Sequence, residues 1–160
     1  MNKFLQLLTL GAVLALGVDA TASAAGGADP AIGTWTLNLD KSKYHDNRAP
    51  KSMTRTYTAA AGGTDMKVTG TAADGTAISQ SATLTYDGKD VPFTGASEYD
   101  TLSLKKVNGT TVKSQLKKAG KVVGNTTRTV SGQGKILTLS TAMKTAKGGT
   151  SHDVAVFDKQ

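Results

Sequence analysis

Short glycine-containing turns divide most of this chain into segments of similar length, and this regularity limits what the chain can fold into. The intervals between the turns are mostly about 12 or 13 residues. The turns are Gly62-Gly63, Asp74-Gly75, Asp87-Gly88, Asn108-Gly109, Ala119-Gly120, Gly132-Gln133-Gly134 and Gly148-Gly149. Asp-Gly and Asn-Gly pairs between alternating segments are strong hairpin signals. The pattern therefore predicts a series of short antiparallel strands, as in a sandwich or barrel.

The segments between the turns alternate in polarity as strands do. One face of the segment before Asp87 carries Ile78, Gln80, Ala82, Leu84 and Tyr86, and the other face carries only Ser and Thr. We expect about eight to ten strands and no long helix. The fold class is all-β, a single antiparallel up-and-down barrel or curled sheet. The stretch from Asp40 to Ser52 is expected to be a loop that caps one end of it.

The hairpin around Asn108-Gly109 permits a sharper prediction. A two-residue loop would mix apolar and charged side chains on one face. A three-residue loop over 108–110 instead pairs Leu102 with Leu116 and Leu104 with Ser114. Because a slip of one residue turns every side chain to the opposite face, burial should select the second register.

The N-terminus has the layout of a secretory signal peptide. A basic start at Lys3 precedes an apolar run of about 15 residues, shorter than the about 20 that a membrane span needs, and the small residues Ala22-Ser23-Ala24 follow. We expect a cleaved signal over 1–24, a linker over 25–32 and one β-barrel domain over 33–160. With no cysteine in the chain, an exported bacterial protein of the periplasm or the extracellular space is favoured over a disulfide-rich scaffold.

The net charge of +7 is unevenly distributed. Residues 101–152 hold ten Lys or Arg side chains and no acidic one, whereas residues 25–100 hold seven basic and nine acidic side chains. The predicted register sets Lys105 opposite Lys113, with Lys117 on the same face. Such a strip would attract an anionic envelope lipid or polysaccharide, although a solvated Lys-rich face also discourages strand aggregation. Aromatic side chains do not interleave with it, so we expect no nucleic-acid partner.

Chemically reactive side chains are few: two His, one Glu and no Cys. Ser151-His152-Asp153 has the residue types of a triad, but neighbours on a strand point to opposite faces and cannot converge. His45 lies beside Asp46, yet a zinc site needs three or four ligands. We therefore expect no catalytic residues, no metal, no cofactor and no enzymatic activity.

Several segments together carry a resemblance to known proteins. They are Gly33-Thr34-Trp35-Thr36-Leu37-Asn38, Lys41-Ser42-Lys43-Tyr44, Tyr86-Asp87-Gly88-Lys89-Asp90, Gly120-Lys121-Val122-Val123 and the final Phe157-Asp158-Lys159-Gln160. With them the chain resembles small exported bacterial lipocalin-like (Gly-x-Trp) β-barrel proteins, whose function is poorly defined. The resemblance implies a calycin-like barrel with Trp35 packed at its closed end. It also implies an Arg from a late strand against the indole, and Arg128 is in position for that role. Gly33 would allow a close backbone approach.

The ligand-binding residues are expected on the inner face of the sheet. Met53, Arg55 and Tyr57 share one face of their segment. If that face points inward, Tyr57 lines a cavity and Arg55 meets a ligand carboxylate. Ile78 and Tyr86 are expected to line the same cavity. Two functions stay open. One is an exported binding protein that holds a small apolar or amphipathic ligand, and the other is an envelope or extracellular structural or interaction protein that binds anionic surfaces and has no internal ligand.

Overall fold

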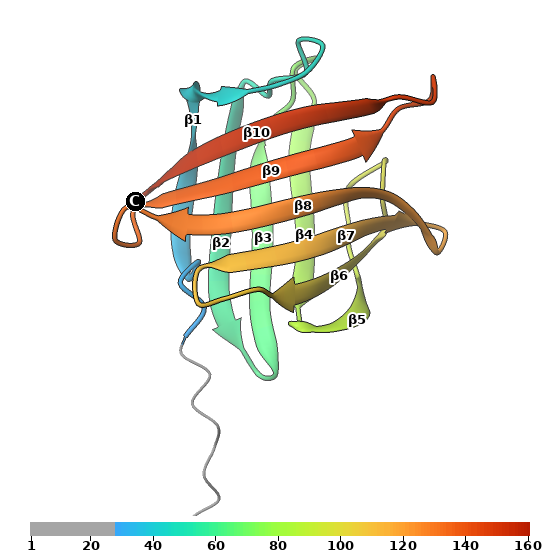
Figure 1. Cartoon of the computed structure of the whole chain (residues 1–160). Coiled ribbons are helices and arrows are strands. Elements are labelled where there is room, and N and C mark those ends of the chain that lie inside the picture. Colours follow the sequence, from blue (N-terminus) through green and yellow to red (C-terminus); the bar gives the residue numbers. More distant parts are fainter. Residues whose placement is uncertain (1–27) are drawn as a thin grey trace, which may run out of the picture.

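Ten antiparallel strands form one sheet that curls into a barrel (Figure 1). The computed structural model describes residues 28–160, so the predicted signal peptide and the first residues of the predicted linker lie outside the described residues. The strands are β1 (Gly33–Lys43), β2 (Ser52–Ala60), β3 (Gly63–Thr71), β4 (Ala77–Leu84), β5 (Asp87–Pro92), β6 (Thr101–Lys106), β7 (Thr111–Lys118), β8 (Lys121–Ser131), β9 (Ile136–Lys144) and β10 (Thr150–Lys159). Within this range, no helix is long and apolar enough to cross a membrane.

The strand order is β4-β3-β2-β1-β10-β9-β8-β7-β6-β5, so successive strands are neighbours and the first strand pairs with the last. In Figure 1, β6–β10 form a layer that crosses in front of β1–β4. This is the up-and-down arrangement that the turn spacing predicts, with the strand count at the upper limit of the expectation.

The barrel closes incompletely between β4 and β5, the two ends of the strand order. One isolated bridge spans this seam, between Ser81 and Thr94. It consists of two backbone hydrogen bonds, from Ser81 N to Thr94 O at 3.1 Å and from Thr94 N to Ser81 O at 3.0 Å. The seam is therefore held by far fewer hydrogen bonds than the other strand junctions.

The hairpin between β6 and β7 has the predicted register. Leu102 pairs with Leu116 and Leu104 with Ser114, which confirms the three-residue loop. Both leucines of β6 are buried. The prediction succeeded because burial of the leucines decides between the two possible registers.

The predicted loop from Asp40 to Ser52 is shorter in the structure. Strand β1 continues to Lys43 after an irregularity in its pairing with β10, and β2 begins at Ser52. The connection is therefore 44–51, and it contains Asp46 and Asn47, both with positive φ. The sequence misplaced the boundary because the end of β1 is polar and resembles a loop.

The core runs through the barrel interior, with Trp35, Phe157, Leu137 and Val68 as its largest fully buried side chains. The Trp35 indole N–H donates to the carbonyl oxygen of Ala31 at 2.7 Å. This bond ties the segment before β1 to the same end of the barrel.

Candidate functional site

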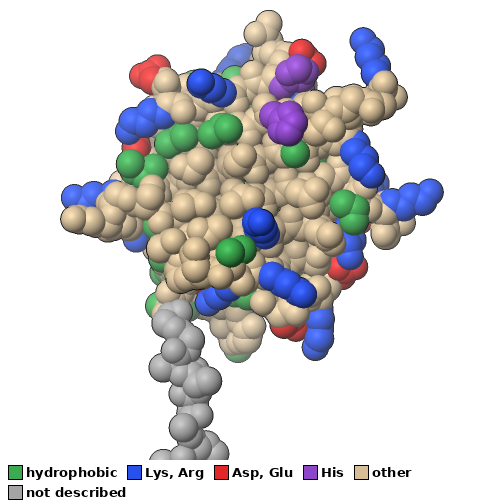
Figure 2. All heavy atoms as spheres, viewed as in Figure 1, with side chains coloured by type: hydrophobic (Ala, Val, Ile, Leu, Met, Phe, Trp, Pro, Cys, Tyr) green, Lys and Arg blue, Asp and Glu red, His purple; other side chains and the backbone are tan. Residues whose placement is uncertain are grey.

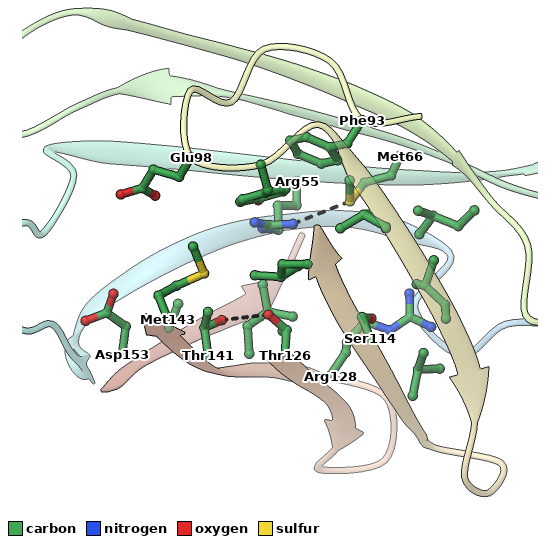
Figure 3. A pocket seen from close by; sticks show the side chains of 18 of the residues that line it. Arg55, Met66, Phe93, Glu98, Ser114, Thr126, Arg128, Thr141, Met143 and Asp153 are labelled. Atoms are coloured by element: carbon green, nitrogen blue, oxygen red, sulfur yellow. Dashed lines mark hydrogen bonds between the residues drawn. The ribbon is translucent and has the colours of Figure 1, made fainter. Parts of the chain in front are cut away.

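The interior contains a cavity of about 190 Å³ between the two layers (Figure 3). Most of its wall is apolar. The apolar lining includes Met53, Met66, Phe93, Leu104, Val112 and Leu139. Alternation along each strand explains this wall, since every second residue of an antiparallel barrel points inward.

Arg55 of β2 is a charged side chain in this apolar wall. Its Nε is buried without a hydrogen-bond partner, and its Nη1 donates only to the thioether sulfur of Met66, at 3.4 Å. The guanidinium carbon lies 5.6 Å from the ring centroid of Phe157. No ion pair joins Arg55 to an acidic residue of the described chain. The arrangement leaves a cation able to meet an anionic group inside the barrel.

Tyr44, which follows β1, provides a second unsatisfied polar group at the cavity. Its hydroxyl is buried and has no hydrogen-bond partner. Burial raises the pKa of Tyr44 to about 12, so its hydroxyl keeps its proton at neutral pH. The group is therefore available as a neutral donor or acceptor.

Hydroxyl side chains form a polar band across one wall. Ser114, Thr126 and Thr141 come from the adjacent strands β7, β8 and β9 and all line the cavity. The hydroxyls of Thr126 and Thr141 lie 3.0 Å apart in a hydrogen bond. Each hydroxyl can both donate and accept, so the band can adapt to a polar ligand group.

One end of the barrel is closed by the floor cluster, which we define as Asp29, Tyr86 and Arg128. The Arg128 Nη2 donates to the two carboxylate oxygens of Asp29 at 2.8 and 2.9 Å, and both side chains are buried. Asp29 also accepts hydrogen bonds from the Tyr86 hydroxyl and, at 3.0 Å, from the backbone N–H of Ala31. The guanidinium lies over the rings of Tyr57 and Tyr86, at 5.2 and 5.6 Å from their centroids.

The floor cluster perturbs the titration of its members. Burial alone would raise the pKa of Asp29, but the charge of Arg128 and the hydrogen bonds from Tyr86 and Ala31 together hold it below its usual value. Burial raises the pKa of Tyr86. The cluster therefore contains a carboxylate, a neutral phenol and a guanidinium at neutral pH.

A second charged cluster lies at the rim of the cavity. We call it the charged bridge and define it as Arg48, Glu98 and Asp153. Arg48 lies in the β1–β2 connection, Glu98 lies between β5 and β6, and Asp153 lies on β10. The Arg48 guanidinium donates to Glu98 and to Asp153, each at 3.3 Å, and to the Ser151 hydroxyl at 3.2 Å. The members of the charged bridge line the cavity, so the bridge joins three elements across it.

The four predicted ligand contacts divide into two pairs. Arg55 and Tyr57 line the cavity, whereas Ile78 and Tyr86 are absent from its wall. Ile78 packs against the core of apolar side chains, and Tyr86 joins the floor cluster. Facing inward follows from alternation, but contact with the cavity depends on which part of the interior other side chains leave empty.

The predicted structural residues also need one correction. Trp35 is fully buried near the Asp29 end of the barrel, but the cation beside its ring is Lys159, at 5.2 Å from the centroid, and not Arg128. The Arg128 guanidinium is engaged by Asp29 and two tyrosine rings. Gly33 has a positive φ of 129°, and a Cβ there would meet the Lys159 side chain.

The predicted basic strip is partly neutralised in the structure. Lys105 and Lys113 are exposed and directly paired across β6 and β7. Lys117 on β7, in contrast, contacts Asp90 on β5 at 2.6 Å, across the intervening strand β6. On the face shown in Figure 2, Lys and Arg side chains are scattered and do not form one continuous patch. The sequence count missed this pairing because the acidic residues come from the other half of the chain.

Sequence reasoning did not identify Tyr44, Arg48, Asp29 or Asp153 as site residues. Tyr44 and Arg48 lie in a loop, where no periodicity shows which way a side chain points. Asp29 precedes the first strand. The only feature of the sequence that could have identified it is a carboxylate a few residues before the Gly-x-Trp segment. The Ser151-His152-Asp153 segment behaves as expected, since Ser151 and Asp153 contact Arg48 while His152 is exposed.

The overall architecture resembles that of calycin-type barrels. The crystal structure of zebrafish ileal bile acid-binding protein complexed with cholic acid superposes with a TM-score of 0.53 at 12% identity, covering 82% of this chain and 99% of that one. A redesigned β barrel, mFAP1, bound to DFHBI gives a TM-score of 0.42 at 13% identity, covering 81% of this chain and 95% of that one. No family model and no curated protein matches the chain. At 12% identity, the similarity to the zebrafish protein establishes the fold alone, an all-β calycin-type barrel.

Proposed function

We propose that this protein binds, and does not chemically convert, a small amphipathic molecule inside its barrel. The observation that carries the proposal is Arg55, whose half-buried side chain has a buried, unpartnered Nε and no acidic partner in an otherwise mainly apolar wall. An apolar ligand body would cover the wall, and a carboxylate or similar anion would pair with Arg55. The zebrafish protein with this architecture binds cholic acid, which is consistent with a ligand in the barrel.

The cavity volume limits the ligand to a compact molecule. Drug-sized ligands occupy pockets of about 300–1,000 Å³, and an apolar cavity of about 150 Å³ holds one benzene molecule. The cavity here is about 190 Å³. It therefore suits a single-ring or short-chain carboxylate.

We also propose that the protein is exported and that binding takes place in the periplasm or outside the cell. The basic start, the apolar run and Ala22-Ser23-Ala24 support this location. The intact mass of the protein purified from its own envelope tests it. A mass that begins after residue 24 is the expected result, and an uncut chain would overturn the export proposal.

Native mass spectrometry of the same sample tests the binding function. A stoichiometric small molecule that is released on denaturation is expected. The R55Q variant should lose it, because a neutral amide cannot form an ion pair with an anion. The K67Q variant is the matched control, since Lys67 is exposed on β3 next to the Val68 position that pairs with Arg55.

Titration with benzoate gives the same test without knowledge of the natural ligand. Benzoate combines a single ring with a carboxylate, and we expect R55Q to bind it about tenfold or more weakly than the wild type. K67Q should bind it as the wild type does. Equal affinity in R55Q and the wild type would contradict the assignment of Arg55.

The second function, binding of anionic surfaces through the Lys-rich face, has less structural support. Lys105 and Lys113 favour it, because these exposed cations are paired across two strands. Lys117 and Lys118 oppose it, because they contact Asp90 and Asp100. Co-sedimentation with vesicles containing anionic phospholipid separates the two functions. Strong adsorption that is abolished by a K105Q/K113Q double variant would favour the surface function.

A further inference from the structure

Arg128 has more hydrogen-bond donors than the floor cluster uses. Its contacts to Asp29 and to the Tyr86 hydroxyl all involve Nη2. Its Nε and Nη1 are buried and have no hydrogen-bond partner in the described chain, and the residue is only 5% exposed. A buried donor that has lost its water is stabilised by any acceptor brought to it.

The charge balance differs between the two arginines of the cavity. The charge of Arg128 is already matched by Asp29, at 2.8 Å. Arg55 has no such counter-ion in the described chain. An anionic ligand group therefore belongs at Arg55, whereas Arg128 can offer N–H groups to an acceptor that carries no charge.

The two guanidinium groups are placed to contact different parts of one compact ligand. Arg55 comes from β2 and Arg128 from β8, and Figure 3 shows both among the side chains that line the cavity. Arg128 lies over the ring of Tyr57, which is two residues beyond Arg55 on the same face of β2. Two residues of a strand span about 7 Å, a distance that a substituted single ring can bridge.

We propose that the ligand is a compact monocarboxylate with a neutral oxygen acceptor, such as a carbonyl, at its far end. The carboxylate pairs with Arg55, and the neutral oxygen accepts a hydrogen bond from Arg128. The inference rests on the proposed binding function and adds a second, uncharged recognition site to it.

Three ligands of similar shape test the inference on the mature wild-type protein by titration calorimetry. They are 4-acetylbenzoate, 4-isopropylbenzoate and terephthalate, which place a neutral acceptor, an apolar group and a second carboxylate at the same ring position. We expect 4-acetylbenzoate to bind about tenfold more tightly than 4-isopropylbenzoate, and more tightly than terephthalate. Equal affinities for the first two, or tightest binding of terephthalate, would overturn the inference and leave the binding function standing. If neither these ligands nor benzoate bind, the binding function fails as well.

Two variants assign the effect to Arg128. R128K keeps a cation beside Asp29 but removes Nε and Nη1, so the advantage of 4-acetylbenzoate over 4-isopropylbenzoate should fall to about twofold or less. D29N leaves the Arg128 charge unmatched, so the affinity for terephthalate should rise about tenfold relative to the affinity for 4-acetylbenzoate. K113Q, on the exposed outer face, should change neither ratio. Near-UV circular dichroism checks that each variant is folded. If a variant does not fold, the comparison of the three ligands on the wild-type protein decides the inference alone.

Discussion

Asp29 stands before the first strand, yet it is the counter-ion of a buried arginine. Its side chain is 3% exposed and its partner Arg128 is 6% exposed. Removing one member of a buried pair leaves an uncompensated charge, which is costly. Asp29, within the predicted linker 25–32, therefore contributes to the packed end of the barrel.

The Asp29–Arg128 pair should make the stability of the protein depend on pH. The folded-state pKa of Asp29 lies below its usual value, so its stabilisation is fully present above the unfolded pKa of about 3.9 and is lost as pH falls through the folded pKa. We expect D29N to lower the free energy of unfolding by about 3 kcal/mol at pH 7 and by much less at pH 2. Urea unfolding at both pH values measures this.

An exposed carboxylate provides the control for that experiment. D40N changes an exposed residue of β1, and we expect it to stay within about 0.5 kcal/mol of the wild type. A D29N effect of the same size at both pH values would show that the loss comes from packing and not from the charge of Asp29.

At the scale of elements, the charged bridge joins the β1–β2 connection to β10 and to the segment before β6. Arg48 and Glu98 are 42% and 57% exposed, so their contact is weak and open to water, and Asp153 is 20% exposed. A ligand that passes this rim must separate these contacts. The bridge is therefore expected to govern access to the cavity more than the stability of the barrel.

The R48A variant tests the role of the bridge in access. We expect the association and dissociation rates of benzoate, measured by stopped flow, to rise several-fold with little change in affinity. Unfolding free energy should fall by less than about 1 kcal/mol, as for other exposed ion pairs. The K89A variant, which loses an exposed contact to Asp87, is the matched control and should leave both rates unchanged. Unchanged rates in R48A would place the passage elsewhere.

The seam between β4 and β5 gives a second prediction for an element. Gly95 has a φ of 90°, and a Cβ on it would collide with the backbone carbonyl of Ser79. G95A is expected to cost about 1–3 kcal/mol and to speed hydrogen exchange of the Ser81 and Thr94 amides, which form the bridge across the seam.

A second glycine supplies the control for the seam. Gly109 lies in the β6–β7 loop without a positive φ, and nothing lies within 4 Å of a Cβ built on it. We expect G109A to leave stability and exchange at the seam nearly unchanged. If G95A behaves like G109A, the seam tolerates displacement and does not depend on this close approach.

For the whole molecule, the sequence predicted what burial and alternation control. The register of Leu102 with Leu116 and the shared face of Arg55 and Tyr57 both follow from period two, whereas the structure decides that this shared face points inward. The contacts of Arg48 could not be predicted, because they join a loop to segments about 50 and 100 residues away. Tyr86 was predicted as a ligand contact and not as part of the floor cluster for the same kind of reason: its partner Asp29 comes from outside the strand pattern.

The size of the cavity limits the size of the ligand that this barrel can enclose. The zebrafish bile acid-binding protein holds cholic acid, which has four fused rings. A cavity of about 190 Å³ has room for about one ring. We expect benzoate, at a concentration 100 times its dissociation constant, to stabilise the folded protein by about 2.7 kcal/mol and to raise the melting temperature by several degrees.

Cholate at the same concentration should leave the melting temperature unchanged, because the interior side chains occupy the space that its other rings need. Replacing Leu139 or Val112 by alanine would enlarge the cavity, since both line it and are buried. Each variant should be less stable than the wild type and should bind aromatic carboxylates that are larger than benzoate. A wild-type protein stabilised by cholate as strongly as by benzoate would mean that the barrel opens to admit larger ligands, so that cavity volume would not set its specificity.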